Sequence, residues 1–329
     1  MTATPEALTD PATTANNLLA RTINIPLDIG SDPDHTWTLA SDDQTLDRTF
    51  DLCRDAGFTA VRLMLAWFTV AEPDPPFTID PAALERVSRA VDHATDHGLA
   101  VIIQAVLDDR LFADPAAHRD RLLAITRQVA EPFADRPATV LLEPAAEPRG
   151  ALDAVWNEYL ADLVTAVRES NPDRTLIFGP GAYNNARALS ALILPEGERN
   201  IILTIHQYWP IAFTMQGETW LGTDNPFGDP ASWLGTTWDG TDQQRGELAA
   251  GFAAVAHWAQ AAGRPVFLGE FGTSNNADMA SRVRWTEFNR RLAEEHGFTW
   301  GVWSFGPSFA VYDDASDSWH PQLLAALGL

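Results

Sequence analysis

One pattern recurs along this chain: an amphipathic helical segment, a glycine, and then a short apolar run. Four glycines separate a helical stretch from such a run: Gly57, Gly98, Gly263 and Gly297. A glycine just past a helix adopts, at little cost, the left-handed conformation that ends the helix. Helix followed by strand, repeated along a chain, predicts parallel strands joined by helical crossovers.

The repeat predicts an α/β fold with eight strands. The apolar runs lie near residues 21–28, 58–65, 99–106, 138–146, 174–179, 200–206, 265–270 and 298–304. Between them, apolar residues recur at helical spacing, as at Leu46, Phe50 and Cys53. Eight such units in one chain of 329 residues favour a single closed (β/α)8 TIM barrel. An open doubly wound sheet is the alternative, but no G-x-G-x-x-G turn follows the first strand.

The barrel is expected to occupy residues 21–329, with residues 1–20 as a flexible N-terminal arm. Residues 207–240 form an unusually long connection after the sixth strand. Four tryptophans lie in it: Trp209, Trp220, Trp233 and Trp238. Loops of this length in compact domains are usually functional or disordered, and the aromatic content favours function. This loop would lie at the C-terminal rim of the barrel, where active sites are built.

The charge of the chain limits its partners. It has 45 acidic and 22 basic side chains, a formal net charge of −23 and a pI near 4.5. That balance argues against nucleic acid or an anionic membrane as a partner, and leaves a small-molecule substrate. No stretch approaches the roughly 18 apolar residues of a membrane span. The N-terminus lacks the features of a signal peptide, so we expect a cytoplasmic protein, or a secreted one if a leader was removed.

Polar side chains interrupt or end several of the apolar runs. Arg62 lies inside the second run, Glu147 closes the fourth, and Glu270 closes the seventh. Other polar or aromatic residues end the sixth and eighth runs: His206, Tyr208 and Trp303. Because all strands of such a barrel end at one rim, these groups should converge on one pocket. Two carboxylates that face each other there are the minimal apparatus for splitting a glycosidic bond.

Six segments resemble, in order, the motifs of the cellulase-type glycoside hydrolases of family five. They are Gly57-Phe-Thr-Ala-Val-Arg-Leu63, Glu147-Pro148, Phe178-Gly-Pro-Gly-Ala-Tyr-Asn-Asn185, His206-Gln-Tyr208 with Phe213-Thr-Met-Gln-Gly217, Gly269-Glu-Phe-Gly272, and Trp300-Gly-Val-Trp-Ser-Phe305. Each motif alone is weak, but six in family order on the expected strands are specific. The resemblance covers nearly the whole chain beyond the N-terminal arm. It implies a retaining (β/α)8-barrel glycosidase.

The resemblance also implies roles for the polar residues. Glu270 would be the nucleophile that attacks the anomeric carbon. Glu147 would protonate the leaving oxygen and then activate water. In a retaining enzyme the two carboxyl groups lie about 5–5.5 Å apart. Arg62 and Tyr208 would keep Glu270 ionised and oriented.

The remaining site residues would bind or support the substrate. His206 would lie beside Glu147 or bind a sugar hydroxyl, and Trp303 would be a floor on which a sugar ring stacks. Three further residues are expected to take part: Asn24, Asp108 and Trp209. Neither a metal nor another cofactor is implied.

The chain departs from the family pattern around the sugar. Ala146 stands where the family has an asparagine that hydrogen-bonds the sugar 2-hydroxyl. Val106 and Leu107 replace a histidine pair, and Met215 stands where histidine is frequent. Three functions therefore stay open. The first is hydrolysis of a small or decorated β-glycoside. The second is acid/base chemistry, such as elimination, cyclisation or rearrangement, on a more apolar secondary metabolite. The third is non-catalytic sugar binding.

Overall fold

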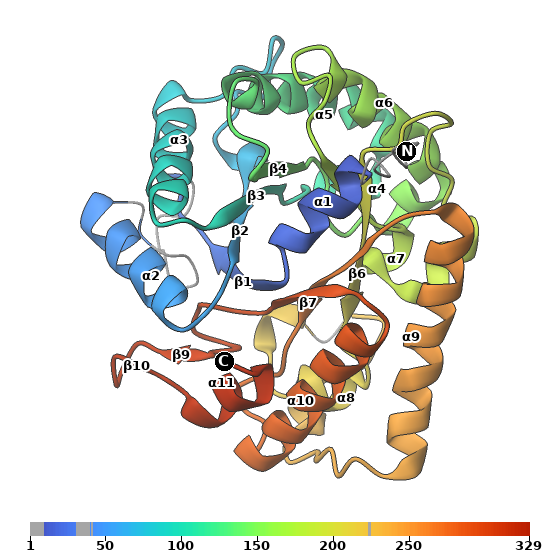
Figure 1. The fold of residues 1–329 in the computed structure, drawn as a ribbon. Helices are drawn as coiled ribbons and strands as arrows, with labels where there is room; N and C mark the ends of the chain where they lie inside the picture. Colours follow the sequence, from blue (N-terminus) through green and yellow to red (C-terminus); the bar gives the residue numbers. More distant parts are fainter. Residues whose placement is uncertain (1–9, 31–39, 41, 223–224) are drawn as a thin grey trace, which may run out of the picture.

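The structure, a computed structural model, describes residues 10–30, 40, 42–222 and 225–329. Eight parallel strands form a closed barrel in sequence order, with β8 paired to β1 (Figure 1). The strands are β1 (Arg21–Pro26), β2 (Ala60–Leu65), β3 (Ala100–Ala105), β4 (Val140–Glu143), β5 (Leu176–Phe178), β6 (Ile201–Gln207), β7 (Val266–Phe271) and β8 (Thr299–Val302). The predicted TIM barrel is confirmed, and the alternative of an open doubly wound sheet is wrong.

The longer helices surround the barrel (Figure 1). The α-helices of the described residues are α1 (Pro11–Leu18), α2 (Asp43–Asp55), α3 (Pro81–Asp96), α4 (Asp109–Ala113), α5 (Pro115–Ala130), α6 (Trp156–Arg168), α7 (Gly181–Asn184), α8 (Ile211–Thr214), α9 (Asp242–Ala262), α10 (Met279–Glu295) and α11 (Pro321–Leu327). A two-stranded hairpin of β9 (Tyr312–Asp313) and β10 (Ser318–Trp319) precedes α11.

Short polar residues and glycines set the ends of these helices. Asp80 caps α3 by accepting a hydrogen bond from the Ala82 N–H, and Pro81 takes the first helical position. Positive φ angles of 63–97° occur at the four glycines that were expected to end helices: Gly57, Gly98, Gly263 and Gly297. The apolar stripe predicted for α2 faces inward, and Leu46, Phe50 and Cys53 are fully buried. The helix–glycine–strand repeat therefore correctly predicted where these helices end and the next strands begin.

The N-terminal end of the barrel is closed by α1. Its side chains Ala12 and Ala15, with Leu19 directly after the helix, join a buried cluster with the first residues of the strands, such as Ala60 and Ala100. Asn16 donates to the Val266 carbonyl at 3.2 Å and accepts from the Thr299 hydroxyl at 2.9 Å. The flexible arm expected over residues 1–20 is therefore not seen for Pro11–Leu18, because small apolar residues let this helix pack on the barrel floor. Residues 1–9 lie outside the described part.

One crossover lacks a full-length helix. Only the short helix α7 and the 3-10 turn Ala186–Ala191 stand between β5 and β6. The 21-residue helix α9 packs against that turn. The outer wall beside β6 is consequently made by α9, a helix that belongs to the next crossover.

The long connection expected over residues 207–240 is present. Its described part contains α8 and the 3-10 turns Thr219–Leu221 and Pro230–Trp233. Trp238 is 1% exposed, with its ring centroid 5.7 Å from that of Phe288, whereas Trp220 is 62% exposed. The loop tryptophans thus divide into residues that pack the loop and residues that solvent can reach.

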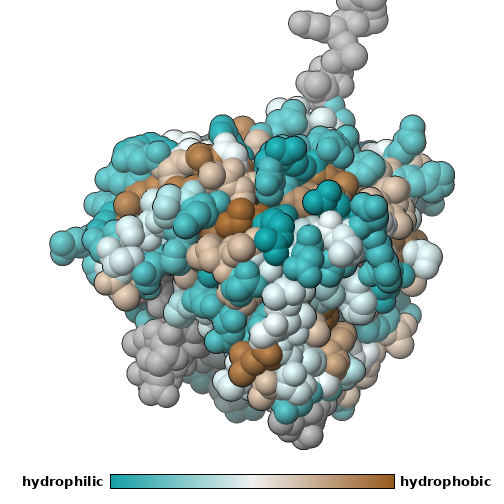
Figure 2. Space-filling view, turned by 90° about the horizontal axis from the view of Figure 1, so that it is seen from below, coloured by the Kyte–Doolittle hydropathy of each residue, from teal (hydrophilic) through white to brown (hydrophobic). Residues whose placement is uncertain are grey.

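The surface is largely polar where Figure 2 shows it. Hydrophobic residues on that face lie singly or in small groups among hydrophilic ones. Such a distribution is ordinary for a folded domain. Among the described residues, no helix is both long and apolar enough to cross a membrane.

Candidate active site

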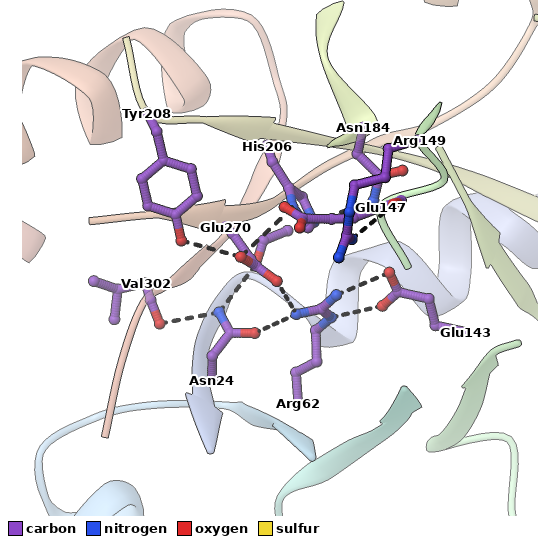
Figure 3. A network of polar contacts seen from close by, with 11 residues as sticks. Asn24, Arg62, Glu143, Glu147, Arg149, Asn184, His206, Tyr208, Glu270 and Val302 are labelled. Atoms are coloured by element: carbon purple, nitrogen blue, oxygen red, sulfur yellow. Dashed lines mark hydrogen bonds and ion pairs between the residues drawn. The ribbon is translucent and has the colours of Figure 1, made fainter. Parts of the chain in front are cut away.

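A buried guanidinium organises the C-terminal end of the barrel (Figure 3). Arg62 on β2 binds Glu143, the last residue of β4, through Nε–Oε2 at 2.6 Å and Nη2–Oε1 at 2.9 Å. Its Nη1 donates to Glu270 Oε1 on β7 at 2.7 Å. Arg62 and Glu143 are 0% exposed and Glu270 is 8% exposed. One cation therefore holds carboxylates from β4 and β7, and its pair with Glu143 has the bidentate geometry that arginine favours.

Asn24 supports this cluster from β1. Its Oδ1 accepts from Arg62 Nη1 at 2.7 Å, while its Nδ2 donates to the Gly269 and Val302 carbonyls at 3.0 Å each. Asn24 is fully buried. It links the guanidinium to β7 and β8. Asn24 was predicted to bind or support the substrate site, and in the structure it supports the site.

Glu270 also meets the two polar residues of β6 and its end. Tyr208 donates its hydroxyl to Glu270 Oε2 at 3.0 Å. His206 Nδ1 lies 2.7 Å from Glu147 Oε1 and 3.5 Å from Glu270 Oε2. One donor or acceptor atom each of Glu147, His206 and Glu270 lie within 4.8 Å of one another. The structure therefore brings the two predicted carboxylates face to face, with an imidazole between them (Figure 3).

The charges in this cluster stabilise one another. Burial alone would raise the pKa of Glu270, but the positive charges of His206 and Arg62 outweigh it, and the pKa is lowered from 4.5. Burial would lower the pKa of His206, but Glu270 and Glu147 raise it above 6.5. Burial and the nearby Glu270 raise the pKa of Tyr208 well above 10. Near neutral pH, Glu270 is thus ionised and Tyr208 is a neutral donor.

The three clustered residues could also hold a divalent cation by donor type and spacing, since carboxylate oxygen and imidazole nitrogen are both ligands. Their present arrangement is already explained by the hydrogen bonds of His206 and by Arg62. We therefore describe the cluster as an acid/base site.

Glu147 does not lie at the end of its strand. The fourth apolar run was expected to continue as a strand up to Glu147, but β4 ends at Glu143, four residues earlier. Glu147 follows on a loop with a φ of 54°. A left-handed conformation is unfavourable for a residue with a Cβ and is often retained where function needs it. The loop thereby turns the Glu147 side chain, still 29% exposed, toward His206.

Two residues of the site were missed from the sequence. Glu143 could have been found as a second acidic residue in the same apolar run as Glu147, close to a buried arginine that needs partners. Asn184 belongs to the segment Phe178–Asn185 that resembles a family motif, but no role was predicted for it. It is fully buried, and its Nδ2 lies 3.3 Å from His206 Nε2. The positive φ angles of Ala182, Tyr183 and Asn184 aim it there.

A family comparison agrees with this geometry. A sequence model of the cellulase family, glycosyl hydrolase family 5, matches residues 28–309. The chain belongs to glycosyl hydrolase family 5. The resemblance read from the six motifs is confirmed, and with it the prediction of a glycoside hydrolase at the level of the family.

Curated relatives of this family 5 chain are named as endoglucanases and cellulases. Endoglucanase H of Acetivibrio thermocellus is 30% identical over 84% of this chain and 30% of its own length. Cellulase/esterase CelE of the same organism is 28% identical over 94% of this chain and 40% of its own length. The chain thus spans well under half of these first two relatives. Endoglucanase 1 of Ruminococcus albus is 28% identical over 83% of this chain and 69% of its own length.

Solved structures are similar over their whole length. Endoglucanase Cel5A from Thermotoga maritima has a TM-score of 0.89 at 34% identity and covers 97% of this chain and 100% of that chain. A complex of Cel5A with mannotriose has a TM-score of 0.86 at 32% identity, covering 96% and 99%. A complex with cellobiose has a TM-score of 0.88 at 33% identity with the same coverage.

Two other predicted site residues, Asp108 and Trp303, form no hydrogen bond or ion pair with the carboxylates among the described residues. Asp108 caps α4 and pairs with Arg110, and its carboxylate lies 3.7 Å from Arg121. The hydrogen bonds and ion pairs of its side chain within the described part of the chain go to these arginines and not to the carboxylate cluster, so the structure does not bring it into the site. Trp303 directly follows β8, is half-buried, and donates its N–H to the Phe271 carbonyl at 2.9 Å. Its role as a sugar platform stays a prediction.

The departures from the family pattern are apolar in the structure too. Ala146 directly precedes Glu147, is 6% exposed and donates its N–H to the Ala105 carbonyl at 3.1 Å. Leu107 is buried, and Met215 lines a cavity beside the site. These positions offer no side-chain hydrogen bond to a sugar.

A cavity of about 850 Å³ opens beside the carboxylates. His206 and Tyr208 form part of its wall, and Trp209 lies 41% exposed at its side with the Arg187 guanidinium 4.9 Å from the ring centroid. The structure thus places the predicted Trp209 in a pocket next to the site, not in contact with the carboxylates themselves.

Proposed function

We propose that this family 5 chain is a retaining glycoside hydrolase that acts on a small or decorated β-glycoside. Glu270 is the nucleophile and Glu147 the acid/base. The observation that supports this most directly is the separation of the two carboxylates, whose nearest ligand atoms lie within 4.8 Å. Retaining enzymes have carboxyl groups about 5–5.5 Å apart, whereas inverting enzymes need about 6.5–9.5 Å to admit a water. The short spacing favours direct attack by a carboxylate.

The two steps use the hydrogen bonds of the site. Ionised Glu270 attacks the anomeric carbon while Glu147 gives its proton to the leaving oxygen, so that the C–O bond breaks and an alcohol departs. Water then attacks the same carbon, Glu147 takes its proton, and the bond to Glu270 breaks. Arg62 and Tyr208 keep Glu270 ionised and fixed in direction before it attacks, and they stabilise the carboxylate again when the second step releases it.

The relatives support a β-linked hexose as the sugar that Glu270 attacks, since they are named endoglucanases and Cel5A is seen with cellobiose and mannotriose. A second candidate uses the same carboxylates for elimination, cyclisation or rearrangement of a more apolar metabolite. The apolar side chains at Ala146, Leu107 and Met215 favour it.

Trapping of the covalent intermediate tests the proposal. A 2-deoxy-2-fluoro β-glycoside with a good leaving group should add the mass of its sugar to the peptide that contains Glu270, because the fluorine slows the second step. Proton NMR of early turnover should show the β-anomer of the product first. Release of the α-anomer would overturn the retaining mechanism. Sugar binding that Glu270→Gln leaves unchanged, without turnover of any glycoside, would favour a non-catalytic binding protein.

We expect a bell-shaped pH profile for kcat/KM. Glu270 must be ionised, and because its pKa is lowered, activity should fall only as the pH drops below 4.5. His206, which is hydrogen-bonded to Glu147, must stay protonated, and because the pKa of His206 is raised, activity should be lost only above pH 6.5. Rates with an aryl β-glycoside between about pH 3 and 9, at constant ionic strength, check this. An acid limb centred well above 4.5 would contradict the ionised state that we assign to Glu270.

Asn184 should set the alkaline limb of that profile. Its amide can donate to neutral Nε2 of His206, or turn its oxygen to accept from the protonated ring. Asn184→Asp, which tolerates the positive φ, adds a negative charge behind the ring and should move the alkaline limb to higher pH by about one unit. Asn184→Leu removes the acceptor and should move it lower. Equal alkaline limbs in both variants would show that Asn184 only packs the site.

A further inference from the structure

Exposed aromatic side chains gather around one cavity. Six large hydrophobic side chains of the described residues are well exposed, and four of them line the 850 Å³ cavity: Tyr183, Trp209, Trp220 and Phe227, at 38%, 41%, 62% and 47%. Exposing these rings to water costs free energy unless a ligand covers them. Their shared location indicates a binding site.

This cavity lies on the acid/base side of the site. Its wall contains His206, which binds Glu147, and Arg149, two residues beyond Glu147 on the same loop. Tyr183 is attached to that loop through its N–H, which donates to the Pro148 carbonyl at 3.0 Å. A general acid protonates the oxygen of the leaving group, so the group that departs must lie next to Glu147. The cavity therefore borders the place where a leaving group lies.

The inner wall of the cavity is apolar. Ile205 on β6 points away from the barrel interior, opposite to its neighbour His206, because side chains alternate along a strand. It lines the cavity together with Leu248, Phe252 and Val255 of α9, beside the crossover in which only α7 and the short turn Ala186–Ala191 stand between β5 and β6. The α9 residue Gly251 also lines it, and a Cβ built there would meet nothing within 4 Å. The cavity thus extends along apolar side chains as far as the backbone of α9 at Gly251.

Several polar groups of the cavity lie on aromatic rings or already have partners. The Arg149 guanidinium lies 5.1 Å from the Tyr183 ring centroid and binds Asp109 at 3.2 Å. The Gln207 side chain accepts from the Trp209 N–H at 3.1 Å. A second sugar pushed against the Ile205 and α9 wall would leave hydroxyls without hydrogen bonds, which is unfavourable. An alkyl or aryl group would not.

We propose that this cavity receives the leaving group of the substrate, and that this group is apolar, an alkyl or aryl alcohol. The proposal rests on the hydrolase function proposed above. Glu147 protonates the glycosidic oxygen, Glu270 bonds to the anomeric carbon, and the free alcohol is left in the cavity. The substrate class is then a β-glycoside of a hydrophobic alcohol, rather than a plain glucan.

Binding to an unreactive variant tests the proposal without turnover. Methyl, butyl, hexyl and octyl β-glucosides are titrated calorimetrically into the Glu270→Gln protein, below the concentrations at which they form micelles. A fully buried methylene contributes about 0.8 kcal/mol, or roughly fourfold in affinity. We expect the affinity to rise at least about tenfold from butyl to octyl. Affinity that is independent of chain length would overturn the proposal.

A matched pair of variants locates the effect. Gly251→Leu places a side chain in the cavity and should remove most of the gain from butyl to octyl. Gly246→Leu makes the same change on the same helix, at an exposed position that also has nothing within 4 Å of its Cβ and does not line the cavity. It should retain the gain. An unaltered chain-length dependence in Gly251→Leu, with melting temperatures showing both variants folded, would place the alkyl chain elsewhere.

The two proposals fail separately. Chain-length-dependent binding without turnover of any alkyl or aryl glycoside would keep the cavity assignment and reject hydrolysis. Efficient hydrolysis of cello-oligosaccharides, with no preference for hydrophobic leaving groups and no effect of Gly251→Leu, would keep hydrolysis and reject the apolar leaving group.

Discussion

Glu270→Gln should reduce turnover on the order of 10⁵-fold or more on every glycoside, because no other described carboxylate is placed to form the covalent intermediate. Glu147→Gln should depend on the leaving group. General acid catalysis contributes about 10²–10⁴-fold, so alkyl glycosides should lose that much, whereas aryl glycosides with acidic phenols, which leave without a proton, should lose far less in the first step. Steady-state and single-turnover rates on both substrate types check this.

Glu85→Gln is the control, since Glu85 is exposed on α3, away from the site. It should leave both rates unchanged. Equal losses of Glu147→Gln on alkyl and activated aryl substrates in the first step would contradict the acid role of Glu147. Substantial activity of Glu270→Gln would remove the nucleophile from the mechanism.

Arg62→Met should be the most destabilising single change in the site. It leaves two buried carboxylates, Glu143 and Glu270, without their shared cation. Removing one partner of a buried ion pair typically costs about 3–5 kcal/mol in the free energy of unfolding. Urea unfolding at neutral pH measures this loss.

The loss of unfolding free energy in Arg62→Met should be smaller at acid pH. The pKa of Glu270 is lowered in the folded protein, so its contribution to stability is present above pH 4.5 and disappears as the pH falls through the folded pKa. The difference in unfolding free energy between Arg62→Met and the unaltered protein should therefore be smaller near pH 3 than near pH 7. Arg127→Met, which breaks an exposed pair with Glu169, should change stability little at either pH. A large loss that does not vary with pH would mean that packing, not charge, explains the effect of Arg62→Met.

Much of the fold could be predicted from the sequence because its signals are local. The glycines after helices and the apolar runs depend on neighbours in the chain, and all eight strands lie where these signals indicated. The helix α1 was missed because its apolar residues are small, as at Ala12 and Ala15, and its stability comes from the barrel floor that it covers.

Most residues of the site and several of its contacts were predictable from the sequence, but the backbone that shapes it was not. Glu270, His206 and Tyr208 meet because strand ends meet, and that follows from the barrel, whereas Glu147 reaches His206 from a loop. The ending of β4 at Glu143 was not predictable from the run Val140-Leu-Leu-Glu-Pro-Ala-Ala, in which apolar residues continue past the strand. The left-handed turn at Glu147 and the partnership of Asn184 with His206 depend on backbone angles that residue types alone do not specify.

The floor helix α1 has a practical consequence for anyone who trims this protein. The stretch that matches the family model begins at residue 28, after both α1 and β1. A fragment cut to that boundary would lack strand β1 of the barrel and helix α1, which covers the barrel floor. It would expose the β2 and β8 edges to aggregation and would take away Asn24, which anchors the guanidinium. Recombinant fragments should therefore start no later than Asp10, the residue that caps the N-terminus of α1.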